Sequence, residues 1–195
     1  VLIPILIIAV IIGAIFAIKF FYKPKPQYEI VNYNGFVFIK QGPKMWTTQV
    51  QRGENIYTAM FKYNPYEVEN ITVNYLMNNF TKITKQQDKI YITFDPDATN
   101  LAYVALASAD MSNVLSKVFN IRAIAACTKN ITSGCATIPI QTCSTTGRIV
   151  IYIKEDPIQN ITYSGNCLTI QGDKEELVKA AARVTMEWYG IIKAE

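Results

Sequence analysis

Histidine is absent from the 195 residues of this chain. Imidazole acid–base chemistry and imidazole metal ligation are therefore excluded together, and a Ser-His-Asp triad cannot be built. The nucleophile motif G-x-S-x-G and the phosphate-binding motifs G-x-x-x-x-G-K-[ST] and G-x-G-x-x-G are missing as well. We therefore expect no enzyme, no cofactor and no bound metal ion.

Strong charge is also missing. The formal net charge is +4, and three lysines (Lys19, Lys23 and Lys25) lie close to the start of the chain, so the remainder is nearly neutral. No basic run is interleaved with aromatic residues in the way that is typical of nucleic-acid binding. We expect no nucleic-acid partner.

The chain opens VLIPILIIAVIIGAIFAIKFFY, and its first charged side chain is Lys19. A helix over residues 1–22 would rise about 33 Å, which matches a hydrocarbon core of about 30 Å. The stretch is apolar on all sides, which excludes a surface helix. We expect residues 1–22 to form a hydrophobic anchor helix of transmembrane type, followed by a Lys/Pro spacer at residues 23–27. A cleavable signal peptide and a buried core helix are the alternatives.

Small residues within this stretch would let another helix approach closely. They are Ala9, Gly13, Ala14 and Ala17. An apolar segment kept at the N-terminus, after a leader is cut off before Val1, resembles the type IV pilins, the archaeal ones in particular. The chain departs from the common bacterial pattern, because Ile5 stands where a glutamate is usual and Pro24 and Pro26 would end the helix early. The resemblance implies a filament subunit whose partners are membrane lipid and copies of itself.

Two features favour a position outside the cytoplasm for residues 28–195. Four Asn-x-Thr acceptors for N-glycosylation occur, at Asn70, Asn79, Asn130 and Asn160. The cysteines are even in number and close together. The lysines after the apolar stretch favour the opposite orientation by the positive-inside rule, unless a basic leader precedes the chain. We expect an extracytoplasmic, glycosylated domain at the cell surface.

The four cysteines are Cys127, Cys135, Cys143 and Cys167. Zinc ligands usually come in pairs two to four residues apart, often with histidine, and neither condition holds. We expect two disulfides that tie the loop over residues 128–146 to a sheet. Three pairings are open.

The rest of the chain alternates in the way that is typical of strands, and then shows two stretches with helical periodicity. The strand segments are EIVNY, GFVFIK, NIYTAMFKY, ITVNYL, KIYITF, RAIAAC, RIVIYIKE and the pair in NITYSGNCLTIQG. The first helix is expected to start at Asp95-Pro96-Asp97 and the second at the capping box Asp173-x-x-Glu176. The fold class is therefore α+β, with two helices packed on one face of a mixed sheet. Residues 28–85 are a candidate β subdomain, and residues 86–195 are the α/β part.

Three functions fit these patterns. The preferred one is a non-enzymatic surface protein that is anchored or assembled through its N-terminal helix, in its stronger form a pilin-like filament subunit. The second is a single-pass accessory subunit of a membrane complex. The third is a membrane-tethered hydrolase or binding protein that uses Asp95 and Asp97 as a carboxylate pair or a Ca²⁺ site. Aromatic residues of the strand region, such as Trp46 and Tyr66, are candidates for a partner surface.

Overall fold

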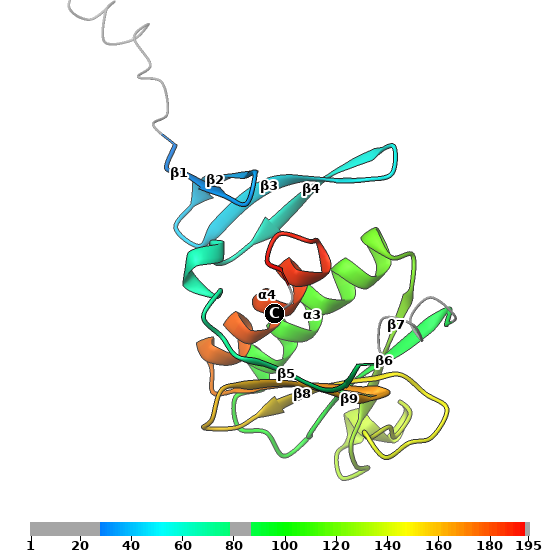
Figure 1. Ribbon diagram of the computed structural model, residues 1–195. Helices are drawn as coiled ribbons and strands as arrows, with labels where there is room; N and C mark the ends of the chain where they lie inside the picture. The colour runs from blue at the N-terminus through cyan, green and yellow to red at the C-terminus, as the bar shows by residue number, and fades with distance from the viewer. Residues whose placement is uncertain (1–27, 79–86, 194–195) are drawn as a thin grey trace, which may run out of the picture.

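The computed structural model describes residues 28–78 and 87–193. These residues form three layers, in which two helices lie between two β-sheets (Figure 1). Sheet A is an antiparallel meander of four strands in the order β1-β2-β3-β4. Its strands are β1 (Ile30–Tyr33), β2 (Phe36–Gly42), β3 (Met45–Arg52) and β4 (Asn55–Phe61).

The turns of sheet A follow from local sequence. Asn34 and Gly35 both have positive φ, 46° and 83°, which matches the two-residue hairpin turn that Asn-Gly favours. One face of the sheet carries Phe38, Trp46 and Phe61, all of which are buried. This face points toward the helices.

Sheet B is mixed and has six strands in the order β5-β9-β10-β8-β6-β7. The strands are β5 (Val73–Asn78), β6 (Lys89–Phe94), β7 (Arg122–Cys127), β8 (Val150–Glu155), β9 (Asn160–Gly165) and β10 (Cys167–Gly172). β7, β6, β8 and β10 are parallel, whereas β9 is antiparallel to β10. Helix α3 (Leu101–Val118) is the crossover between the parallel strands β6 and β7.

Helix α4 (Glu175–Trp188) joins the two halves of the core because it is buried on two sides. Ala181 and Val184 belong to the cluster that covers sheet B, whereas Ala182 and Met186 belong to the cluster under sheet A. Alanine is small, so both sheets can approach the helix axis closely. The polar residue Arg183 is also buried, and its guanidinium donates to Glu187 at 2.9 Å.

The prediction of one mixed sheet with two helices on one face is wrong in two respects, namely the number of sheets and the position of the helices. The strands form two separate sheets, and the helices are sandwiched between them, because α4 has apolar side chains on opposite sides. Neither helix among residues 28–78 and 87–193 has the length and apolarity of a membrane crossing. The predicted anchor helix at residues 1–22 and the spacer at residues 23–27 lie outside the described residues.

Both expected helix starts are also wrong. The Asp95 carboxylate accepts the backbone N–H of Asp97 at 3.0 Å and forms a turn, and α3 begins only at Leu101. Helix α4 begins after Lys174, which has a φ of 44° and makes no side-chain cap. The chain reverses direction directly behind β10, so the backbone carbonyl of Asp173, not its carboxylate, accepts the N–H of Glu176 at 2.9 Å.

Candidate functional site

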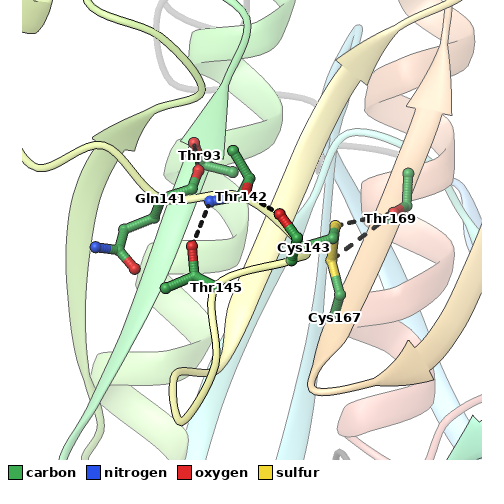
Figure 2. The surroundings of a disulfide bond; sticks show 8 residues. Thr93, Gln141, Thr142, Cys143, Thr145, Cys167 and Thr169 are labelled. Atoms are coloured by element: carbon green, nitrogen blue, oxygen red, sulfur yellow. Dashed lines mark hydrogen bonds between the residues drawn. A yellow bond between two sulfur atoms is a disulfide. The ribbon is translucent and has the colours of Figure 1, made fainter.

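A cysteine-bonded loop, residues 128–149, joins β7 to β8 and crosses the outer face of sheet B (Figure 2). One disulfide joins Cys127 at the end of β7 to Cys135 in a short 3-10 helix, Ser133–Ala136. The other joins Cys143 to Cys167 at the start of β10. The prediction of two disulfides is therefore confirmed, and this is the pairing that the sequence left open.

Hydrogen bonds hold the same loop against the sheet. The hydroxyl of Thr93, which is fully buried in β6, donates to the carbonyl of Gln141 at 2.8 Å. The backbone of Cys127 donates to Pro139 at 3.1 Å and accepts from Gln141 at 2.9 Å, so the loop extends sheet B by one short bridge. The loop therefore serves as a fixed cover over sheet B.

The two carboxylates that the sequence singled out as a hypothetical site, Asp95 and Asp97, share a lysine. The ammonium of Lys129 lies 3.2 Å from Asp95 and 2.6 Å from Asp97. The hydrogen bond to Asp97, followed by the one to Asp95, raises the pKa of Lys129. This contact ties the cysteine-bonded loop to the turn before α3, so the two aspartates have a structural use.

Glu155, at the end of β8, supplies the cap for α3 that the local sequence does not. Its carboxylate accepts the Thr99 hydroxyl at 2.6 Å, the Asn100 backbone N–H at 3.0 Å and the Asn100 side-chain amide. These donors, with Thr99 contributing most, lower the pKa of Glu155 to about 2. A negative charge at a helix N-terminus also interacts favourably with the helix dipole. Sequence reasoning missed this residue because the cap comes from 55 positions away.

Acids thus gather just after β6 and at the end of β8. Asp95, Asp97 and Glu155 each bind a partner within the fold. Within residues 28–78 and 87–193 no group of three or more Cys, Asp or Glu side chains could hold a metal ion. The geometry gives these carboxylates a role in stability.

The predicted glycosylation acceptors lie in different environments. Asn70 and Asn130 are exposed in loops. Asn160 is half-buried in β9, where its amide accepts from Asn74 at 2.6 Å and donates to Thr162 at 3.0 Å. Asn79 lies outside the described residues, as do the predicted helix-packing residues Ala9, Gly13, Ala14 and Ala17.

Most aromatic residues of the strand region pack within the fold. Trp46 and Tyr63 are buried, and Tyr75 stacks on Tyr163 with ring centroids 5.2 Å apart. Tyr33 meets Tyr66 edge-on at 5.1 Å. The aromatic side chains therefore do not gather into one exposed binding face.

The outer face of sheet A is the surface that the sequence did not reveal. The strand register places on it Ile30, Asn32, Val37, Ile39, Gln41, Met45, Thr47, Gln49, Gln51, Ile56, Thr58 and Met60. No member of this set is charged. Its large apolar members Ile30, Val37, Met45, Ile56 and Met60 are 41–65% exposed.

Two lysines of the β2–β3 hairpin point away from this face. Lys40 pairs with Glu29 at 2.6 Å and lies 5.2 Å from the Trp46 ring, on the side of the sheet that faces the helices. Lys44, in the β2–β3 turn, pairs with Glu175 of α4 at 2.5 Å. The run GFVFI, which places apolar side chains on both faces of β2, is the local signal for this surface, whereas the outward side of β3 carries Thr47, Gln49 and Gln51.

Comparison with protein-family models, with curated proteins and with solved structures yields no match to this chain. Its function must therefore be argued from its own residues.

Proposed function

We propose that this protein is a non-enzymatic structural or interaction protein of the cell surface. Its apolar segment, residues 1–22, holds it at the membrane or brings copies together, and the three-layer domain faces an oxidising space. The observation that carries the proposal is the pairing of all four cysteines in disulfides directly on the folded sheet. Disulfides persist in oxidising compartments and are rare in the cytosol of mesophiles.

The contacts that the acidic residues make within the fold support a structural role. The acids near the carboxyl ends of the parallel strands cap a helix or bind Lys129, as in a rigid scaffold. A membrane-tethered hydrolase at Asp95 and Asp97 is therefore the least favoured of the three functions.

In its stronger form, the proposal is a glycosylated, pilin-like filament subunit, of the kind found on archaeal surfaces. Exposed acceptors at Asn70 and Asn130 are compatible with glycans on the outside of such a filament. The alternative is an accessory subunit of a membrane complex, in which residues 1–22 pack against other membrane segments.

Surface exposure and assembly are tested together in cells that make the full chain. A membrane-impermeant amine label, added to intact cells, should modify exposed lysines of the domain such as Lys174. Sheared surface material should contain the protein in filaments under the electron microscope. A protein that is labelled on intact cells but found only in membrane fractions would favour the accessory subunit. A protein labelled only after lysis would refute the proposal.

The hydrolase alternative has its own control. We expect hydrolytic activity at background level both in the wild type and in Asp95→Asn. The variant should only weaken the contact with Lys129. An activity in the wild type that this variant abolishes, with an unchanged melting curve, would overturn the non-enzymatic assignment.

A further inference from the structure

The outer face of sheet A is chemically unlike the other sheet surface of the domain. An antiparallel sheet that faces water on one side normally alternates apolar and polar residues. In sheet A both faces carry apolar side chains. The face that points away from the helices combines Ile, Val and Met with Thr, Asn and Gln. The outer face of sheet B, by contrast, carries Lys154 and the guanidinium of Arg148 over Tyr91.

The composition of the outer face of sheet A excludes some kinds of binding partner. A membrane-surface site usually has Lys or Arg for lipid phosphates and Trp or Tyr at the headgroup level. The face has neither, because Lys40 and Trp46 of the same strands point to the helices. A strongly charged protein partner would likewise find no opposite charge to pair with.

The same face of a second copy of this protein is a partner that needs neither charged nor aromatic side chains on this surface. In a twofold contact each patch meets itself, so any net charge on it would repel its own image. A neutral patch of aliphatic, threonine and amide side chains avoids this repulsion. The row Ile30, Ile39, Thr47, Met60 runs across all four strands and would supply apolar contacts from edge to edge.

The position of the face in the chain adds a second argument. The 27 residues outside the description at the N-terminus connect through Tyr28 to β1, the edge strand of this sheet. Under the proposed function, on which this inference rests, residues 1–22 bring copies side by side. Sheet A is the first folded element that follows this segment in the chain, so its outer face is a candidate for contact between neighbouring copies.

We infer that the outer face of sheet A is a homotypic interface, at which the sheets of two copies pack face to face. Packed sheets lie about 10 Å apart with their strands roughly aligned. Four strands spaced about 4.8 Å apart and about six residues long cover roughly 400 Å². This is about half of the roughly 800 Å² per partner of a standard stable interface. The face therefore adds to an assembly that residues 1–22 initiate, and does not hold two domains together alone.

Charge substitution at the centre of the face tests the inference in the full chain. Gln49 is exposed on the central strand β3, and Gln49→Glu and Gln49→Lys are close in size to the native side chain. Each variant alone should associate about tenfold more weakly than wild type, because like charges then face each other across the interface. Thr137→Glu and Thr137→Lys, exposed next to the 3-10 helix of the cysteine-bonded loop, are the matched controls.

The assay is chemical crosslinking and sedimentation of the full chain in detergent and in reconstituted bilayers. The inference predicts that mixing the Q49E variant with the Q49K variant restores association, because opposite charges then meet. Loss of association without restoration would assign the face to another occupant and overturn the homotypic interface. Equal association of all variants, or a wild type that stays monomeric, would overturn it too. The proposed function would fail separately, through labelling of the domain only after cell lysis.

Discussion

Glu155 caps α3, and the effect of removing this cap can be worked out from the contacts of its carboxylate. Glu155→Gln keeps the shape of the side chain but removes its charge. The Gln amide would place donor hydrogens against the donors of Asn100, whose backbone N–H lies 3.0 Å from the carboxylate. Of the distant side-chain acceptors at the start of α3, only Asp173, which accepts from the Asn100 amide at 3.4 Å, would keep its charge.

The magnitude follows from the number and kind of these hydrogen bonds. Hydrogen bonds to charged groups contribute about 1.5–3 kcal/mol, and loss of a helix N-cap costs about 0.5–2 kcal/mol. Because Glu155 is only half-buried, solvent replaces part of the lost interaction. We therefore expect Glu155→Gln to lower the free energy of unfolding by about 2 kcal/mol at pH 7. In a domain of this size, that corresponds to a fall of roughly 4–8 °C in Tm.

The lowered pKa of Glu155 predicts how the free energy of unfolding changes with pH. The pKa of Glu155 is about 2 in the folded protein, against an ordinary value of 4.5. Because folding favours the ionised form, the stabilisation is fully present above about pH 4.5 and is lost as the pH falls toward 2. The difference between wild type and Glu155→Gln should therefore shrink over this range.

Denaturant unfolding of the oxidised full chain in mild detergent, followed by tryptophan fluorescence, measures both effects. Trp46 and Trp188 report on the clusters at sheet A and sheet B. Glu54→Gln, in the exposed β3–β4 turn, is the control for loss of one carboxylate. Equal stability of the two variants at pH 7, or a difference that does not change between pH 5 and pH 2.5, would refute the capping role.

Three further perturbations follow from the packing. Gly172→Ala should destabilise the domain by about 1–3 kcal/mol in denaturant unfolding, because the added Cβ would lie 2.7 Å from the backbone nitrogen of Leu177. The control Gly134→Ala should be nearly neutral, because its Cβ would lie in open space. Replacing Cys143 and Cys167 together by serine should lower the unfolding free energy by about 3 kcal/mol, slightly more than the same change at Cys127 and Cys135, because the loop that it opens is longer. Asn70→Gln and Asn130→Gln should each remove one glycan mass from the native protein, whereas Asn160→Gln should remove none; equal losses at all three would contradict the half-buried placement of Asn160.

Elements with strong local patterns were predictable from the sequence. Strand alternation located most of the strands, and the apolar stripe located α4. The even cysteine count, in a region without metal-ligand spacing, predicted two disulfides but not their pairing. Each disulfide joins a loop cysteine to a cysteine at a strand end, so the pairing depends on the path of the loop across sheet B.

The helix starts and the layer arrangement depend on contacts that are distant in the chain. Asp95 and Asp173 look like caps locally, but Glu155 and the reversal after Gly172 determine where α3 and α4 begin. The sequence also showed the apolar stripe of α4 that faces sheet B more clearly than the side that bears Val178 and Met186, which packs under sheet A. For this reason one sheet was expected and two are found.

The central claim, a disulfide-bonded domain in an oxidising space, is tested most directly by the mass of the native protein after thiol alkylation. Cells are treated with the alkylating agent before lysis, and the purified chain is weighed before and after reduction and a second alkylation. The account predicts no adduct in the first step and one adduct on each of the four paired cysteines in the second. Four adducts in the first step would show that the cysteines are reduced thiols in the cell and would contradict the account.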